Sequence, residues 1–519
     1  ESTTRVAIIP GVLILENNNT FGRTENKKKL LYKCYPADKL LPVFLIPYDV
    51  KLEFNKQLSN KYILFKYEHW NDKHPRGIIT ETMGDVDKLE PFYEYQLYCK
   101  NLQISLTRFT QKTRTIDTSD VFIETIFKNT KIQVEDRRNQ NIITIDPENS
   151  LDFDDGISIN PIITNSIQTG WTVSVYISNV YFWLETLELW QNMTERVSTI
   201  YLPDRKRPML PNILSDILCS LRQNCLRIAL VMDVQLDMSG NPINENNIQY
   251  KNALINVSKN YVYEDRKLIT KDKMYKNLLS LTKIMDPKTR DSHDVVAYWM
   301  ILMNLYTGQI LKTNKCGIFR TATYKDTITK IIPNEVADET RRVIQTWNNI
   351  NGQYKLFKEN TKLEHDLIEP IHNKSSTYVQ ITSPIRRLVD VLNQIILFKI
   401  VNKIPISEDA EIFLQKWMEQ IEYINTTMKS IRKIQTDCEL LAKFTKNPSI
   451  ANQLYTGVII DRTENKHGEY QYIIYIEGLK LVSRIKTNDE MIMYSIVNIN
   501  LFLFQDEDKL KRKIRAQIK

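Results

Sequence analysis

Four aspartates stand within ten residues in the stretch TIDPENSLDFDDGISI, which spans residues 144–159. Short apolar runs flank them on both sides. Carboxylates packed this closely repel one another, so that their charged forms are disfavoured unless cations neutralise them. A solvated acidic turn would be the simpler interpretation of two such residues. Four in the pattern D-x5-D-x-D-D indicate a cation site, made of Asp146, Asp152, Asp154 and Asp155.

Oxygen ligands alone favour a hard cation, so the sequence predicts Mg2+, with Mn2+ as the alternative. No His or Cys lies near the aspartates to favour zinc. An EF-hand loop needs Gly at its sixth position and Glu at its twelfth, and neither fits from Asp146 or Asp152. Two Mg2+ ions can stabilise the attacking and leaving oxygens of a phosphodiester displacement. The chemistry expected is therefore metal-assisted phosphoryl transfer.

A second motif is ITSPIRRLVD, residues 381–390. Ser383 is a favoured helix cap and Pro384 suits a first turn, so a helix is predicted to start here. Arg386 and Arg387 would then lie at the positive end of that helix, where anions bind. Two surface arginines near a helix start are the alternative. The functional interpretation is an arginine that contacts a transferring phosphate.

A third motif is YLPDRKRPMLPNILSDILCSLRQN, which begins at Tyr201. A tyrosine before a basic, proline-framed loop is typical of an aromatic platform beside phosphate contacts. Taken alone this pattern is weak evidence, because a Tyr-Leu-Pro turn is common. The formal net charge of +8, from 70 Lys and Arg against 62 Asp and Glu, fits a polyanionic partner. That balance gains meaning only if the basic residues surround a site that handles phosphate.

The cysteines and the apolar runs narrow the class of protein. No C-x-x-C pair occurs among the six cysteines, which argues against a zinc ribbon or a thioredoxin-like site. Scattered cysteines predict a reducing, intracellular compartment, with the cytoplasm favoured and a nuclear, mitochondrial or viral origin left open. The six histidines are scattered as well and are predicted to be structural. No run of eighteen apolar residues and no signal peptide are visible, so no membrane association is expected. The first residue is Glu1 rather than Met, which leaves the natural start and any targeting segment open.

The chain is too long for one ordinary domain, and its pattern predicts an α+β protein of three parts. Residues 1–115 show short β-rich runs, which favour a small barrel of the OB type. Residues 116–450 combine strands around the aspartates with long helical periods, as in DVVAYWMILMNLYTGQIL and IRRLVDVLNQIILFKIV. Helices are also expected in LWQNMTERVSTI, NILSDILCSLRQN and EVADETRRVIQTWNNI. Residues 451–519 return to strands and close with the basic tail DKLKRKIRAQIK.

The three motifs together resemble the RNB family, the RNase II-type 3′-to-5′ exoribonucleases. The family's T-I-D-P followed by D-x-D-D matches Thr144 to Asp155, and its M-L-P-x-x-L-S-x-x-L-C-S-L run matches Met209 to Leu221. Its T-S-P-I-R-R-x-x-D matches Thr382 to Asp390. The N-terminal flank resembles the second cold-shock barrel of the eukaryotic, exosome-nuclease-like branch. The C-terminal strands resemble the family's S-one-type RNA-binding barrel. The resemblance implies a cold-shock-like OB domain over residues 1–115, an RNB catalytic domain over 116–450 and an S-one-like OB domain over 451–519.

The resemblance also implies roles for individual residues. Asp146, Asp152 and Asp155 resemble metal ligands, and Asp154 resembles both a ligand and the carboxylate whose loss abolishes cleavage. Arg386 matches the arginine at the scissile phosphate, with Arg387 beside it on the RNA. Tyr201 resembles an aromatic that stacks on a base, and Tyr263 resembles the tyrosine near the RNA 3′ end. The implied enzyme is a Mg2+-dependent hydrolase that degrades single-stranded RNA to nucleoside monophosphates.

Several positions depart from the family pattern. Ala297 and Tyr298 stand where the helix motif E-E-x-M-x-x-A-N places two acids. In the strand usually written V-H-I-A-D-V, Tyr176 and Asn179 replace His and Asp. The second aromatic that clamps the bases has no clear counterpart. A catalytically weakened, RNA-binding relative that acts in RNA regulation or as a complex subunit is therefore the alternative. A monomer is favoured, and the organism, the RNA substrate and a helicase or exosome-like partner stay open.

Overall fold

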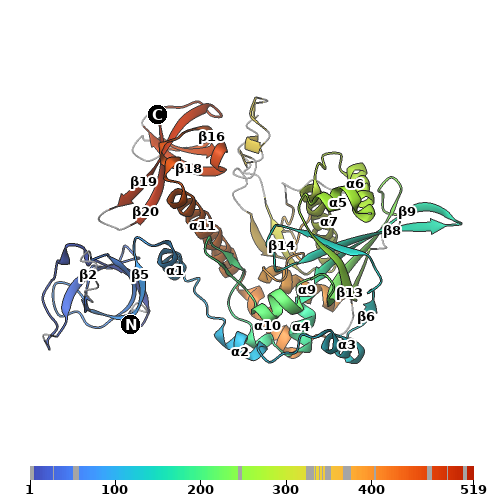
Figure 1. Ribbon diagram of the computed structural model, residues 1–519, viewed down its shortest axis with the longest axis horizontal. Coiled ribbons are helices and arrows are strands. Elements are labelled where there is room, and N and C mark those ends of the chain that lie inside the picture. Colours follow the sequence, from blue (N-terminus) through green and yellow to red (C-terminus); the bar gives the residue numbers. More distant parts are fainter. Residues whose placement is uncertain are drawn as a thin grey trace.

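The computed structural model describes residues 5–26, 28–50, 58–243, 248–322, 332–333, 335–337, 339–341, 343–344, 352–365, 376–401, 405–464, 470–487, 489–506 and 511–519. Figure 1 shows three bodies: an N-terminal barrel, a large central α/β unit and a C-terminal barrel joined to the centre by one long helix. Strands and helices are mixed in the central unit, so the predicted α+β class with flanking barrels is confirmed.

The N-terminal barrel contains β1 (Ile9–Leu13), β2 (Leu30–Pro36), β3 (Phe44–Tyr48), β4 (Lys61–Tyr67) and β5 (Gly77–Asp85). They form an antiparallel sheet in the order β3-β2-β1-β4-β5. A bridge between Leu45 and Arg76 brings β3 to the start of β5 and curves the sheet into the barrel expected from the sequence. Alternate residues of these strands fill a small core of their own, including Ile9, Leu13, Tyr32, Phe44, Ile63 and Phe65.

The segment after this barrel is helical, whereas the sequence favoured strands up to residue 115. The structure has α1 (Leu89–Cys99), α2 (Thr107–Thr113) and α3 (Asp120–Asn129). Phe92, Tyr93, Tyr95 and Leu97 of α1 are buried, which holds this helix between the barrel and the large core. Burial of this aromatic face therefore prevails over the local strand pattern. The domain boundary at residue 115 stays a prediction.

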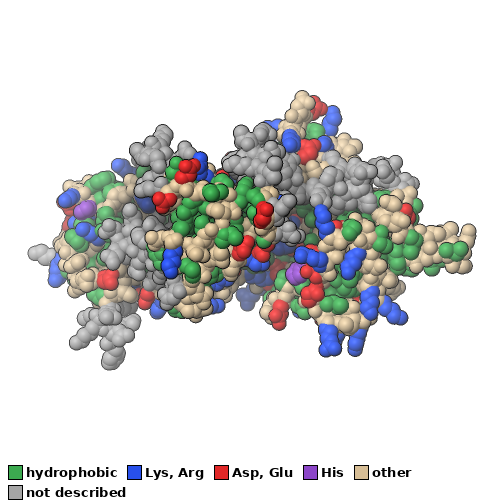
Figure 2. Space-filling view, turned by 90° about the horizontal axis from the view of Figure 1, so that it is seen from above, with side chains coloured by type: hydrophobic (Ala, Val, Ile, Leu, Met, Phe, Trp, Pro, Cys, Tyr) green, Lys and Arg blue, Asp and Glu red, His purple; other side chains and the backbone are tan. Residues whose placement is uncertain are grey.

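The central sheet positions the aspartate motif. Its strands are β6 (Val134–Asp136), β7 (Ile142–Asp146), β8 (Asp155–Thr164), β9 (Ile167–Ser178), β12 (Leu226–Asp237) and β13 (Gln249–Val262). Their order is β12-β9-β8-β7-β13-β6, and β12 also pairs with β13, so that the sheet closes on itself. The β8–β9 hairpin projects from the body in both overall views (Figures 1 and 2). The acidic loop is the connection from β7 to β8.

Helices pack on this sheet and carry the second motif. They are α4 (Val180–Thr186), α5 (Arg266–Lys271), α6 (Lys273–Met285), α7 (Ser292–Thr313), α9 (Leu388–Val401), α10 (Glu408–Glu419) and α11 (Ile421–Lys446). The two long apolar periods are thus confirmed as α7 and α9. Residues 388–398 of α9 are all buried, so this helix runs through the interior. A Cβ on Gly308 of α7 would lie 2.5 Å from the Thr377 carbonyl oxygen, so glycine permits close packing there.

Two expected helices are shorter than predicted. In LWQNMTERVSTI only a 3-10 turn, Trp190–Asn192, forms. The rest of that segment pairs with the second motif instead, because Thr199 N donates to Arg386 O (3.0 Å) and Leu388 N donates to Val197 O (3.0 Å). In NILSDILCSLRQN the structure has one π-helical turn, Ile213–Leu218. In the helix expected over residues 335–350, residues 339–341 and 343–344 are helical and 335–337 are not, while 338, 342 and 345–350 lie outside the described residues.

Two short strand pairs and a second barrel complete the fold. The pairs are β10 (Ile200–Tyr201) with β11 (Lys206–Arg207), and β14 (Ile318–Thr321) with β15 (Gln353–Leu356). The C-terminal barrel contains β16 (Leu454–Glu464), β17 (Tyr470–Ile476), β18 (Leu481–Thr487), β19 (Ile496–Asp506) and β20 (Lys511–Ile518). Most of the expected basic tail is therefore the strand β20. Single turns lie at Glu16–Asn18, Pro448–Asn452 and Glu477–Leu479. The six cysteines are free, and no described helix is long and apolar enough to span a membrane.

Candidate active site

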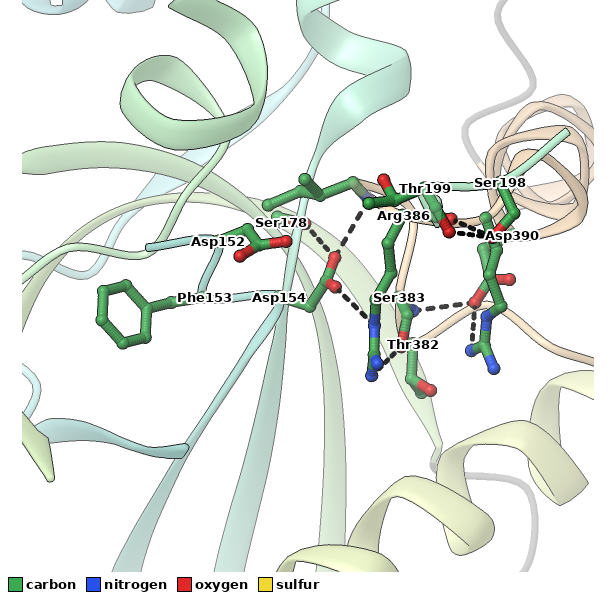
Figure 3. A network of polar contacts seen from close by, with 12 residues as sticks. Asp152, Phe153, Asp154, Ser178, Ser198, Thr199, Thr382, Ser383, Arg386 and Asp390 are labelled. Atoms are coloured by element: carbon green, nitrogen blue, oxygen red, sulfur yellow. Dashed lines mark hydrogen bonds and ion pairs between the residues drawn. The ribbon is translucent and has the colours of Figure 1, made fainter. Parts of the chain in front are cut away.

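Asp154 is the last residue of the acidic loop, directly before β8, and is held by two other segments (Figure 3). Its Oδ1 accepts from Ile385 N (3.0 Å) and from Ser178 Oγ (3.3 Å), and its Oδ2 accepts from Arg386 Nε (3.2 Å). The side chain is 3% exposed. Burial raises the pKa of Asp154 to about 7, and Arg386 and the Ile385 N–H oppose that rise. The carboxylate therefore joins the first motif to the second across the chain.

Asp146 and Asp155 form a partly buried acidic pair at the two ends of the same loop. Asp146 is the last residue of β7, and Asp155 is the first residue of β8. Burial and the nearby Asp155 carboxylate raise the pKa of Asp146 to about 8. Burial raises the pKa of Asp155 to about 6, against the opposing effect of Arg386 and Arg387. Asp146 Oδ2 is buried and has no hydrogen-bond partner. The positive charge that the protein places near these two carboxylates is therefore too small to neutralise both of them.

Asp152 faces a different set of groups. Its Oδ1 lies 3.2 Å from Lys206 Nζ, and its Oδ2 accepts from the Tyr201 hydroxyl (3.1 Å). Lys206 also pairs with Asp216 at 2.9 Å. The β10–β11 ladder pairs Tyr201 with Lys206, which explains why both reach the same carboxylate. Burial, and then the charge of Asp152, raises the pKa of Tyr201, while its side chain stays 41% exposed.

These contacts determine which of the four aspartates are available to bind a metal ion. In the part of the chain that the structure describes, no three or more His, Cys, Asp or Glu side chains are arranged to hold a metal. Mg2+, however, is commonly bound by one or two carboxylates, with water and substrate phosphates as the other ligands. Asp146 and Asp155 fit that role, because a cation would satisfy the partnerless Asp146 oxygen and the excess charge of the pair. For Asp152 and Asp154, whose oxygens contact Lys206 and Arg386, a ligand role stays a prediction.

The second motif differs locally from its prediction. α9 begins at Leu388, and a turn over residues 384–387 precedes it, so Ser383 is not its cap. Ser383 N donates to Asp390 Oδ1 (2.7 Å), and Ser383 Oγ accepts from Arg386 Nη2 (3.0 Å). The physical reason is the antiparallel bridge between Ser198 and Arg387, which keeps this segment out of the helix.

The two adjacent arginines point to different partners. Arg386 contacts Asp154 and Ser383, and 47% of its side chain is exposed, so donors remain available to a ligand. Arg387 Nη2 instead donates to Asp390 Oδ1 at 2.7 Å, and Asp390 is fully buried. Arg387 therefore anchors the turn to α9. Its role in RNA binding stays a prediction.

Tyr263 lies beside the acidic pair. Its N donates to Asp146 O (3.1 Å), and burial, Asp155 and Asp146 together raise the pKa of its phenol to about 12. Its ring stacks on His293, with centroids 3.6 Å apart and planes 9° from parallel. The sequence pointed to Tyr263 only through the resemblance. The scattered histidines are predicted to be structural, and no spacing signal in the sequence connects His293 with Tyr263, thirty residues before it.

The residues that depart from the family pattern are accommodated in the fold. The Tyr176 hydroxyl and Ser158 Oγ are 3.1 Å apart inside the sheet. Asn179 caps α4 by accepting from Phe182 N (3.0 Å), and its Nδ2 donates to Asn252 (2.8 Å). On α7, Tyr298 is buried and Ala297 is exposed. No carboxylate therefore replaces the missing acids at these two positions of α7.

Burial of the acids gives a testable dependence of stability on pH. The pKa values of about 8, 7 and 6 for Asp146, Asp154 and Asp155 lie above the value of about 3.9 for an unfolded Asp. The folded state thus binds more protons than the unfolded state between about pH 4 and pH 8, and stability falls as pH rises through that range. We expect the melting temperature in EDTA to fall from pH 5 to pH 8. Added Mg2+ should raise it more at pH 8 than at pH 5.

Asp146→Asn is the control for this experiment, because it removes the group whose pKa is raised most. This variant should show a smaller pH dependence and a smaller Mg2+ effect than the natural chain. A melting temperature that is independent of both pH and Mg2+ in the natural chain would contradict the acidic pair as a cation site.

Comparisons with known proteins agree with this geometry. Residues 134–278 match the family model of the RNB domain. Exoribonuclease 2 of Haemophilus influenzae (strain PittGG) is 45% identical over 101 residues, which cover 19% of this chain and 15% of the relative. DIS3-like exonuclease 2 of Schizosaccharomyces pombe is 30% identical over 231 residues, which cover 42% of this chain and 24% of the relative. The matched stretches thus span no more than about a quarter of these curated relatives.

Two solved structures share the fold over nearly the whole chain. RNase R of Mycoplasma genitalium, in complex with ribose-methylated single-stranded RNA, has a TM-score of 0.70 at 15% identity and covers 98% of this chain and 90% of its own. The yeast protein Ssd1, described as a pseudonuclease, has a TM-score of 0.63 at 14% identity and covers 96% of this chain and 67% of its own. Residues 134–278 are thus similar in sequence to the RNB domain, and nearly the whole chain shares the fold of RNase R.

Proposed function

We propose that the protein is a Mg2+-dependent 3′-to-5′ exoribonuclease that degrades single-stranded RNA to nucleoside monophosphates. One observation carries this proposal: Arg386, with free donors, is held on Asp154 next to the partly buried pair Asp146 and Asp155. A phosphate would meet a guanidinium on one side and a cation-binding acidic pair on the other. The family relatives named exoribonucleases support the same activity.

Each side chain has a distinct task in the proposed reaction. Arg386 binds a non-bridging oxygen of the scissile phosphate and stabilises the charge that develops on it. Asp154 fixes Arg386 and orients the attacking water. Tyr201 stacks on a base, and Tyr263 contacts the 3′ end beside the acidic pair. A Mg2+ or Mn2+ ion held by Asp146 and Asp155 would supply Lewis-acid stabilisation of the phosphate oxygens.

The direct test uses one single-stranded RNA labelled at either end, incubated with Mg2+ or with EDTA. The 3′ label should appear as a nucleoside monophosphate in the first samples, while the 5′-labelled RNA shortens progressively. A 3′-phosphate or a blunt duplex end should slow the reaction, and EDTA should stop it. Early internal fragments would indicate an endonuclease and would overturn the proposal.

A catalytically weakened RNA-binding protein is the second candidate. Two observations favour it: Ala297 and Tyr298 replace the acids of the family helix, and the fold also matches a pseudonuclease. In that case RNA binds, but no Mg2+-dependent monophosphate appears at any enzyme concentration. A helicase or an exosome-like assembly would be the protein partner to seek by co-purification.

Tyr201 provides a prediction about substrate binding. If its exposed ring stacks on a base, Tyr201→Ala should weaken RNA binding by about 1–3 kcal/mol. Tyr201→Phe keeps the ring and loses only the hydroxyl contact with Asp152, which retains Lys206, so its effect should be small. Fluorescence anisotropy with a labelled RNA in EDTA measures both variants. Equal losses would show that the hydroxyl contact, rather than stacking, is what matters.

A further inference from the structure

Three arginines converge where α11 packs against the β14–β15 hairpin. Arg320 of β14 pairs with Tyr354 of β15, and its guanidinium carbon lies 5.1 Å from the centre of the Tyr354 ring. Tyr354 N donates to Asn425 Oδ1 of α11 (2.7 Å), and Asn425 Nδ2 donates back to Tyr354 O (3.0 Å). Arg432 follows Asn425 by seven residues and therefore lies on the same face of α11. The third member is Arg387.

The charges of this cluster do not balance within the described part of the chain. Arg387 pairs with Asp390, but neither Arg320 nor Arg432 forms an ion pair with a described carboxylate. Arg320 and Arg432 thus leave two positive charges without an ion-pair partner among the described carboxylates. Burial lowers the pKa of Arg320, and the charges of Arg432 and Arg387 act in the same direction. An unpaired, partly buried cation such as Arg320 is costly, so the cluster is suited to accept an anion.

The cluster adjoins the proposed cleavage site. Arg387 is the chain neighbour of Arg386, which contacts Asp154, and the two side chains diverge from the same turn. Arg387 is 22% exposed and Arg320 is partly buried, whereas Arg432 is exposed, so the cluster opens to solvent at Arg432. A polyanion lying on Arg386 could therefore extend to solvent past Arg320 and Arg432. The planar donors of arginine suit phosphate oxygens, which they can contact in pairs.

We infer that Arg320 and Arg432 form a second phosphate site, which holds a backbone phosphate of single-stranded RNA away from the bond that is cut. This inference rests on the proposed function for the identity of the ligand, but it concerns binding alone. The site contributes affinity without touching the reacting phosphate. The phenol of Tyr354 is bonded to Gln380 and that of Tyr378 accepts from Asn304, so these hydroxyls are engaged within the protein.

The experiment measures the affinity for a single-stranded RNA as a function of salt in EDTA, where no cleavage occurs. Each phosphate contact on a single strand contributes about 0.7 to the slope of log K against log salt. Arg320→Gln and Arg432→Gln should each reduce the slope by up to about 0.7, and the double variant should lose about 0.7 in total if both bind one phosphate. Arg320→Lys retains the charge and should keep most of the slope.

The control is Arg138→Gln, because Arg138 is already paired with Asp136 (2.6 Å) and Glu124 (2.8 Å). This variant loses the same charge and should leave the slope unchanged. A melting temperature is measured for every variant. Arg432 is exposed, so Arg432→Gln should fold even if Arg320→Gln does not. An unchanged slope in folded Arg432→Gln, and in Arg320→Gln if that variant folds, would overturn the inference.

A second arm locates the phosphate and distinguishes RNA from a free anion. A set of RNAs carries one uncharged methylphosphonate linkage at successive positions from the 3′ end. One linkage other than the 3′-terminal one should weaken binding to the natural chain and have no further effect in Arg320→Gln. The opposite result is that no internal linkage has this effect, while inorganic phosphate competes with RNA for the natural chain but not for Arg320→Gln. In that case the site binds a free anion, and the inference is wrong.

The two proposals fail separately. Normal monophosphate release with no slope change in the variants would remove the second phosphate site and leave the exoribonuclease proposal standing. A localised linkage effect in a protein that never cleaves RNA would keep the site and remove the exoribonuclease activity.

Discussion

Asp154→Asn should reduce RNA turnover by at least about a hundredfold while RNA affinity stays close to that of the natural chain. The Asn side chain can still accept from Ile385 N, but it no longer offers a charged oxygen to Arg386 Nε. Arg386 would lose its fixed position, and the attacking water would lose a negatively charged partner. Both losses should destabilise the transition state more than they destabilise bound RNA. Single-turnover rates at saturating enzyme, combined with binding in EDTA, separate the two quantities.

The matched control is Asp233→Asn in the same sheet. Asp233 is also a partly buried aspartate paired with an arginine, at 2.6 Å from Arg137, and it accepts from Ser174 Oγ (2.7 Å). Its loss should reduce thermal stability and leave the rate per folded molecule nearly unchanged. If purified Asp154→Asn retains the full rate, the activity comes from a contaminant or another site, and the assignment of the acidic loop is wrong.

Arg386→Gln should lower turnover by about 10²–10³-fold, the usual cost of removing one donor to a charged transition state. Gln has no positive charge to pair with Asp154, and its shorter amide cannot contact Asp154 and Ser383 Oγ at the same time. Arg386→Lys keeps a charge but lacks the planar fork, so it should recover only part of the rate. The measurement is kcat and KM on one RNA, with the larger change expected in kcat.

The neighbouring arginine should behave in the opposite way. Arg387→Gln removes the partner of the fully buried Asp390 and leaves an uncompensated charge in the interior. We expect a large drop in melting temperature and, in the molecules that still fold, a rate well above that of Arg386→Gln. If instead Arg387→Gln lowers kcat as strongly as Arg386→Gln at an unchanged melting temperature, both arginines act on the phosphate.

The sequence was informative where chemistry depends on local spacing. The aspartate pattern places Asp146 and Asp155 at the two ends of one strand connection, so their proximity follows from the loop alone. The apolar periods of α7 and α9 extend over several turns and predicted those helices correctly. Each of these signals is contained within about twenty residues.

Features that depend on tertiary partners could not be predicted in the same way. Residues 193–200 were expected to be helical, but pairing with the turn before α9 gives their backbone other hydrogen-bond partners. The spacing of the four aspartates does not show which cation each contacts, yet Lys206 pairs with Asp152 and Arg386 with Asp154. Those cations come from other elements, and only the fold determines which carboxylate each one reaches. The stack of Tyr263 on His293 has the same origin.

The contact between Arg386 and Asp154 joins residues 232 positions apart, and this separation has a consequence during protein synthesis. A ribosome adds about 5–20 residues per second, so roughly 10–50 s pass between the translation of the two residues. During that interval the nascent chain contains the acidic loop without the guanidinium, the Ile385 amide or α9. The proposed nuclease would therefore be inactive until the second motif leaves the ribosome and docks on the acidic loop.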